Sequence, residues 1–221
     1  MFEGGKIKSQ TVNVTPESLA KIQAAMAAAQ ANSAPPAKKV LVLLWVESSQ
    51  AMELMLTKEV GVMVSMLEKA GYKVVVASAS GNPLVGGATT LKPDLKLADV
   101  KVDDYAGLIL PCLAPTMAGT VIPPEAAEIV RKAVTLGKPV AAQVAGVFTL
   151  SKAGVLSGKQ FAIAAPYVSY VPEGIYKGAG VIQDGNLITS GTCPFMARAG
   201  TFPDGTAELT QKLIDALASA R

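Results

Sequence analysis

The feature that most constrains the fold is the repeated alternation of short apolar segments with helix-forming segments after residue 38. The apolar segments are hydrophobic throughout and do not alternate with polar residues, which is typical of parallel strands buried on both faces. We predict strands at 40–45, 72–78, 107–110, 139–143, 161–164 and 187–189, and a hairpin at 184–186. Helices are predicted at 52–70, 124–136, 148–153 and 206–220. This order predicts an α/β fold whose mostly parallel, doubly wound sheet is sandwiched by helices.

The first 38 residues differ in character from the rest of the chain. Thr15 is a capping residue, Pro16 suits the first helical position, and Glu17 suits the positive end of the helix dipole. We therefore predict a helix from there to about residue 30, followed by a linker that contains Pro35 and Pro36. The prediction is an N-terminal arm and linker at 1–38 and one α/β domain at 39–221. The arm is either a strap on its own subunit or a contact with another subunit.

The composition excludes several classes of mechanism and partner. The 221-residue chain has no histidine, which excludes Ser–His and Cys–His nucleophiles and histidine-ligated metals. No apolar run approaches the roughly 18–20 residues of a membrane span. The net charge is only +3, and the basic residues are scattered, so we expect no nucleic-acid partner. The N-terminus lacks the pattern of a signal peptide, which favours the cytoplasm; the alternative is an exported chain whose signal peptide has been removed.

We also expect no cofactor. The glycines at 86–87 and at 178 and 180 do not stand between a strand and a helix, as those of a phosphate-binding loop do. The loop after the first strand, residues 46–49, contains no glycine that would let a nucleotide or flavin phosphate approach the backbone. We therefore predict neither a nucleotide, a flavin nor a metal ion.

The junction after strand 139–143 is where a catalytic residue is expected. A strand that breaks sharply into a helix lifts one side chain above the sheet, and many α/β hydrolytic folds place their nucleophile there. The lifted residue is Val144, which has no lone pair, no acidic proton and no affinity for metals. A β-branched residue in such a strained turn costs on the order of 1–3 kcal/mol. We therefore expect the turn to have relaxed.

Functional residues of a doubly wound sheet lie at the carboxyl ends of its strands. Cys112 follows the strand at 107–110, and Cys193 follows the strand at 187–189. Each is either a reactive thiol, with Cys112 as a displaced nucleophile or redox-sensitive group, or an inert buried side chain. If both face one crevice, a reversible disulfide between them becomes conceivable.

Several motifs in order resemble the ThiJ/PfpI family of the class I glutamine amidotransferase-like superfamily. They run from residue 39 toward the C-terminus and comprise 40–44, Glu59 with 67–74, 103–111, 137–142, 153–159 and 184–191. The resemblance implies a flavodoxin-like fold. It also implies a turn motif Ala-x-Cys-x-Gly, often followed by histidine, which in this chain reads Ala-Gln-Val-Ala-Gly at 142–146. Valine stands at the cysteine position, and Ala145 at the histidine position.

Two further parts of the family site are implied by the resemblance. The family places a glutamate from the first helix beside the cysteine, and Glu59 is the match, with Glu53 and Glu47 as alternatives. Its Pro-Gly-Gly loop, whose N–H groups stabilise an oxyanion, is replaced here by Pro111, Cys112 and Leu113. The glyoxalase, deglycase, amidase and peptidase activities of the family therefore do not transfer to these residues.

These observations leave three hypotheses for function. The favoured one is a small-ligand-binding or regulatory homodimer without the thiol mechanism, whose pocket is lined by Val144, Ala145, Gly146, Leu113, Cys193 and Glu53. The second is a hydratase, lyase or isomerase that acts on a small carbonyl or unsaturated substrate, with Glu59 as general acid and base. The third is a redox role for Cys112.

Overall fold

The structure is a computed structural model that describes residues 15–33, 37–115, 121–200 and 202–220. It divides into two compact units, residues 1–36 and residues 37–221. The first contains helix α1 (Pro16–Ser33). The predicted cap is confirmed, because the N–H of Ser18 donates a hydrogen bond to Thr15 Oγ1 at 3.2 Å. Residues 1–14 and 34–36 of the predicted arm and linker lie outside the described residues.

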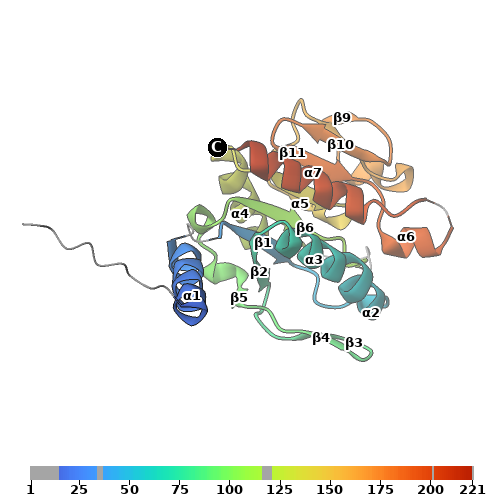
Figure 1. Cartoon of the computed structure of the whole chain (residues 1–221). Helices are drawn as coiled ribbons and strands as arrows, with labels where there is room; N and C mark the ends of the chain where they lie inside the picture. The colour runs from blue at the N-terminus through green and yellow to red at the C-terminus, as the bar shows by residue number, and fades with distance from the viewer. Residues whose placement is uncertain (1–14, 34–36, 116–120, 201, 221) are drawn as a thin grey trace, which may run out of the picture. The chain divides into compact units, whose positions relative to one another are not determined.

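The second unit is built on the predicted, mostly parallel sheet (Figure 1). Its seven strands lie in the order β10-β11-β7-β6-β1-β2-β5. Of the described neighbouring pairs, only β10 and β11 are antiparallel. The strands are β1 (Lys39–Leu44), β2 (Lys73–Ser78), β5 (Leu95–Lys96), β6 (Gly107–Leu110), β7 (Val140–Gln143), β10 (Val181–Asp184) and β11 (Leu187–Ser190). The strands β6, β7 and β11 are buried along their whole length, as expected of parallel strands covered on both faces.

Helices cover both faces of the sheet. In Figure 1, α3 (Gly61–Lys69) and α7 (Thr206–Ser219) pack side by side on the near face, and α4 (Pro124–Thr135) and α5 (Ala145–Lys152) pack together behind it. This arrangement confirms the doubly wound α/β fold. No helix in the described ranges combines the length and apolarity that a membrane crossing needs.

The predicted helix at 52–70 is divided into three segments: α2 (Met52–Met55), the π-helical segment η1 (Leu56–Val60) and α3. A π segment inserts a wider turn into a helix and frequently occurs at functional sites. Here it contains Glu59. The sequence pattern did not predict it, because the apolar positions continue across the junction.

The other departures from the prediction involve short elements. The helix predicted at 148–153 begins earlier, at Ala145, and the strand predicted at 161–164 is reduced to β8 (Gln160–Phe161). The pattern missed β5 and the following elements: β3 (Leu84–Gly86), β4 (Thr89–Leu91), η2 (Leu97–Asp99), η3 (Val102–Asp104), η4 (Ala165–Tyr170), β9 (Ile175–Tyr176) and α6 (Pro194–Arg198).

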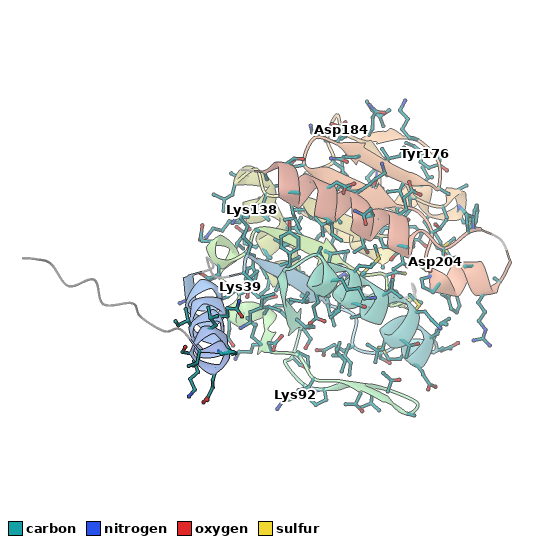
Figure 2. The ribbon with its side chains drawn as sticks, viewed as in Figure 1. Lys39, Lys92, Lys138, Tyr176, Asp184 and Asp204 are labelled. Carbon is teal, nitrogen blue, oxygen red and sulfur yellow. The ribbon has the colours of Figure 1, made fainter. Side chains whose placement is uncertain are left out.

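The amino and carboxyl ends of the parallel strands lie at opposite edges of the sheet. Lys39 begins β1 and Lys138 precedes β7, so both mark the amino end of the parallel strands. Asp204 lies at the opposite end, close to α6 (Figure 2). The loops that follow β1, β6, β7 and β11 gather at this carboxyl end, where the sequence rule places the functional crevice.

Candidate functional site

A cavity of about 220 Å³ lies at the carboxyl end of the sheet. The loops after β1, β6, β7 and β11 all contribute to its walls. Four residues of the predicted site lie together in it: Cys112, Val144, Ala145 and Cys193. The remaining lining residues are Gln50, Ala51, Ala114, Pro115, Tyr167, Phe195 and Met196.

Four other predicted residues lie elsewhere in the described part of the chain. Leu113 and Gly146 are buried beside the cavity but do not line it. Glu53 is exposed and lines a neighbouring hollow with Arg198. Glu59 is fully buried and is not among the lining residues either.

The turn at Val144 has kept its strain, so the expectation of a relaxed turn is wrong. Val144 has φ 42° and ψ −95°, a region that β-branched residues rarely adopt. Its N–H donates to Ser190 O on β11 at 2.9 Å, and its carbonyl accepts from Val147 N at 2.9 Å. The neighbouring strand and the first turn of α5 therefore both hold it in place, which is how strained backbone persists.

Gly146 explains why the turn cannot relax easily. A Cβ atom at this position would lie 2.5 Å from the carbonyl oxygen of Leu110 on β6. This close approach of α5 to β6 requires glycine. It fixes where α5 begins, and the tight connection at Val144 is the consequence. The geometry of a nucleophile elbow is thus present with a buried hydrocarbon at its tip.

Glu59 holds the loop after β6. Its Oε1 accepts a hydrogen bond from the N–H of Cys112 and its Oε2 accepts one from the N–H of Leu113, each at 2.9 Å. Burial raises the pKa of the Glu59 carboxyl well above its usual value, the charge on Cys193 raises the pKa further, and the two N–H groups oppose the shift. Glu47 has a different role, because it is exposed and accepts hydrogen bonds from the N–H and hydroxyl of Ser80.

The loop after β6 is therefore not arranged to bind an oxyanion. Its two N–H groups, on Cys112 and Leu113, already donate to Glu59. The backbone is held in the left-handed region at Leu113 (φ 51°) and Ala114 (φ 42°), and the N–H of Ala114 donates to Cys112 Sγ at 3.3 Å. Non-glycine residues in this region are uncommon, and they indicate that the surrounding structure determines the loop conformation.

Both cysteines line the cavity, and neither forms a disulfide. A hydrogen bond from the Cys112 thiol is the main reason why the pKa of the Cys193 thiol lies below its usual value, and the N–H groups of Met196 and Phe195 lower it further. The same hydrogen bond, followed by burial, raises the pKa of the Cys112 thiol well above its usual value. Cys193 is thus the more acidic sulfur.

A buried polar network fixes the loop that carries Cys193. The Gln143 side chain, at the end of β7, donates from Nε2 to Thr192 O at 2.6 Å and to Thr206 Oγ1 at 3.1 Å. The Thr206 hydroxyl also donates to Asp204 Oδ1 at 2.6 Å. Since Thr192 immediately precedes Cys193, this network positions one sulfur just as Glu59 positions the other.

Sequence reasoning missed seven lining residues. Six of them lie in segments that follow the carboxyl end of a strand, as the residues that it found do. Gln50 and Ala51 follow β1, Ala114 and Pro115 follow β6, and Phe195 and Met196 follow β11. Tyr167 comes from η4, which does not directly follow the carboxyl end of one of these strands. Its ring packs edge to face against Phe148 of α5, with centroids 6.2 Å apart, which holds it at the cavity. Within the described ranges, no group of three or more Cys, Asp or Glu side chains is placed to hold a metal ion.

The fold and site define a class: a flavodoxin-like α/β protein with a nucleophile-type elbow and a buried glutamate that binds the loop after β6. The model of the DJ-1/PfpI family matches residues 38–198. The chain therefore belongs to the DJ-1/PfpI family, as the motif resemblance predicted.

Relatives of known sequence and structure agree with this assignment. A protein of Archaeoglobus fulgidus is 37% identical over 127 residues, covering 56% of this chain and 75% of its own length. The deglycase PfpI of Pyrococcus furiosus is 32% identical over 131 residues, covering 56% of this chain and 76% of its own. The crystal structure of a two-domain Anabaena variabilis protein, with DJ-1/ThiJ/PfpI-like and ferritin-like domains, is 24% identical with a TM-score of 0.59. The match covers 81% of this chain and about half, 54%, of that protein.

Proposed function

We propose that this protein binds a small, mainly apolar molecule in the cavity at the carboxyl end of its sheet, without covalent chemistry at the elbow. The observation that carries the proposal is Val144, which keeps the strained elbow conformation and lines the cavity with hydrocarbon. The name deglycase describes the Pyrococcus furiosus relative, and we do not propose that activity for this chain. A valine cannot form the covalent bond that an elbow cysteine forms.

The chemistry of the cavity wall supports a ligand of this kind. Ala51, Pro115 and Val144 give it apolar surface, and Gln50 and Tyr167 bring polar side chains to it. Its volume of about 220 Å³ lies below the roughly 300–1,000 Å³ of sites for drug-sized molecules. We infer a ligand with a compact apolar body and one hydroxyl or carbonyl group.

The alternative in which Glu59 transfers a proton is less well supported. A general acid or base must come within hydrogen-bond reach of its substrate. Glu59 has no exposed surface, and both its oxygens accept hydrogen bonds from backbone N–H groups. We propose that Glu59 is a positioning residue that holds Cys112 and Leu113 in place.

A ligand titration followed by NMR tests the binding proposal. Phenol, cyclohexanone and isobutanol are the first probes, and backbone amide shifts report the site. We expect saturable shifts at Ala51, Ala145 and Phe195 for at least one of them. Phe195→Ala should weaken that binding about tenfold, equivalent to about 1.4 kcal/mol, because it removes part of the wall.

The control for this titration is Tyr176→Ala. Tyr176 is 40% exposed and Phe195 is 47% exposed, so the two variants remove aromatic rings of similar exposure. Tyr176 packs against Phe161, away from the cavity lining. The Tyr176→Ala substitution should therefore leave the affinity for the probe unchanged. An absence of shifts with all three probes, or equal losses in both variants, would contradict the proposal.

We also propose that the protein is a homodimer, on the family resemblance. Exposed apolar side chains such as Val85, Ile175 and Leu136 are compatible with a contact surface. Sedimentation velocity should give the mass of two chains at micromolar concentration, and the mass of one chain would contradict this.

A further inference from the structure

A second hollow lies beside the cavity and differs from it in chemistry. Its volume is about 420 Å³. The residues that line this charged hollow are Gln50, Ala51, Glu53, Leu54, Thr57 and Arg198. Gln50 and Ala51 also line the cavity, so the two spaces share a wall. A molecule that is too large for the cavity alone can therefore extend into the charged hollow.

The same two short helices contribute to both spaces. Ala51 lies immediately before α2 and lines both, and Glu53 of α2 lines the charged hollow. The helix α6 supplies Phe195 to the cavity and Arg198 to the charged hollow. Since α2 and α6 also pack against each other (Figure 1), the cavity and the charged hollow form one continuous site.

Glu53 and Arg198 bring opposite charges to the charged hollow. Both residues are exposed, and the ion pairs found among the described residues include neither of them. A guanidinium presents N–H groups in a planar fork that fits a carboxylate, and a carboxylate accepts hydrogen bonds from an ammonium group. The two side chains therefore match a molecule that carries one charge of each sign.

The hairpin formed by β3 and β4 limits where the Glu53 carboxylate lies. A Cβ atom at Gly86 would overlap the backbone of Glu53, and one at Gly87 would overlap its carboxylate. These close approaches require glycine at both positions. The Thr57 hydroxyl also donates a hydrogen bond to Glu53 O at 2.8 Å. The negative charge is thus held between the hairpin and the wall that the charged hollow shares with the cavity.

We propose that the cavity and the charged hollow together bind a free α-amino acid with an apolar side chain, such as leucine. The apolar side chain occupies the cavity, Arg198 binds the carboxylate, and Glu53 binds the ammonium group. This ligand assignment rests on the proposed function, because it uses the same cavity. It adds the chemical class of the ligand and two residues that recognise it.

The pair of charges favours a zwitterion over a ligand with one charge. A carboxylate alone would be attracted by Arg198 but repelled by Glu53, and an ammonium group alone would meet the reverse. A free α-amino acid carries both groups on one carbon atom. The end of a peptide carries only one of them, so a peptide terminus fits less well.

The cavity wall selects the side chain of the amino acid. Pro115, Val144 and Ala145 give the wall apolar surface. None of the described residues that line the cavity is Asp, Glu, Lys or Arg. A charged side chain would lose its hydration there without gaining a partner of opposite charge. Aspartate and lysine should therefore be excluded as free ligands.

The test is an NMR titration of the full-length protein with L-leucine. Saturable shifts should appear at the amide of Ala145 in the cavity and at the Nε–H of Arg198 in the charged hollow, with one shared dissociation constant. Two analogues each lack one charge: 4-methylpentanoate has no ammonium group, and isopentylamine has no carboxylate. Each should bind about three- to fivefold more weakly than L-leucine, as expected for the loss of one exposed ion pair. L-Aspartate should give no saturable shift at Ala145.

Two variants assign the charges. Glu53→Gln should weaken L-leucine binding about three- to fivefold but should not weaken 4-methylpentanoate binding. Arg198→Gln should weaken L-leucine binding by a similar factor but should not weaken isopentylamine binding. The matched controls are Glu68→Gln and Lys69→Gln, which remove exposed charges where α3 ends before β2, at the amino end of the sheet. They should leave all three affinities unchanged.

Three results would overturn the proposal. They are L-leucine that gives no shared saturable shift at Ala145 and Arg198, analogues that bind as tightly as L-leucine, and equal losses in the site variants and the controls. If phenol, cyclohexanone or isobutanol still binds in the cavity, the amino-acid assignment alone fails. If none of these probes binds either, the proposed function fails with it.

Discussion

Two side chains define the site at the scale of single residues: the hydrocarbon at Val144 and the buried carboxyl of Glu59. The sequence identified Val144 as the elbow residue, and Glu59 as the family's glutamate through its distance from Gly71. It did not predict the strain at Val144, because that depends on contacts with β11 and β6. Nor did it predict that Glu59 binds two backbone N–H groups, since the loop that supplies them lies more than fifty residues away.

Glu59→Gln should destabilise the fold. A glutamine oxygen can accept from one of the two N–H groups, but its NH₂ group then faces the other, which is left without an acceptor. We expect the free energy of unfolding to fall by about 1–3 kcal/mol, as measured by urea denaturation. Glu68→Gln on the exposed part of α3 is the control and should change it by less than about 0.5 kcal/mol. An equal effect of both substitutions would show that the two hydrogen bonds contribute nothing specific.

The raised pKa of Glu59 predicts a pH dependence of known sign. Above its usual value of 4.5, the carboxyl keeps its proton in the folded protein but loses it in the unfolded chain. The folded state then binds more protons, so the free energy of unfolding falls as pH rises through this window. The unaltered protein should therefore lose stability relative to Glu59→Gln as the pH rises above about 4.5. Urea denaturation of both proteins across this range measures the difference, and a difference that grows in favour of the unaltered protein contradicts the raised pKa.

At the scale of elements, the sequence predicted the long parts of the fold better than the short ones. The strands β1, β2, β6, β7 and β11 were predicted because each contains a run of apolar residues in an order of alternating strands and helices. The strands β3, β4 and β9 are only two or three residues long, too short for a pattern to repeat. The π segment and α6 depend on tertiary contacts. These missed elements include α6, which supplies Phe195 and Met196 to the cavity.

Gly146→Ala tests the packing of α5 on β6. The new methyl group would lie 2.5 Å from Leu110 O, so α5 must move. We expect a loss of about 1–3 kcal/mol in the free energy of unfolding, measured by denaturant titration. Gly180→Ala is the matched control, because its Cβ would have no neighbour within 4 Å. It should leave stability unchanged or raise it by up to about 1 kcal/mol. If both variants had the same stability, the close approach would not be what fixes the elbow.

At the scale of the whole molecule, the second unit should fold without the first. Residues 37–221 contain the complete seven-stranded sheet and the cavity. A chain that begins at Ala37 should keep the calorimetric unfolding temperature of the full chain to within about 4 °C, equivalent to less than about 1 kcal/mol. A larger fall would mean that the N-terminal segment is a stabilising strap. A change in sedimentation alone would favour its other predicted role, contact with another subunit.

The account as a whole holds that the family's elbow persists here without its chemistry. Methylglyoxal turnover by the full-length protein tests this most directly, with the Cys112→Ser, Cys193→Ser double variant measured alongside. We predict that the unaltered protein consumes methylglyoxal no faster than buffer does. Consumption above that rate would contradict the account, and its persistence in the double variant would locate the activity away from both sulfurs.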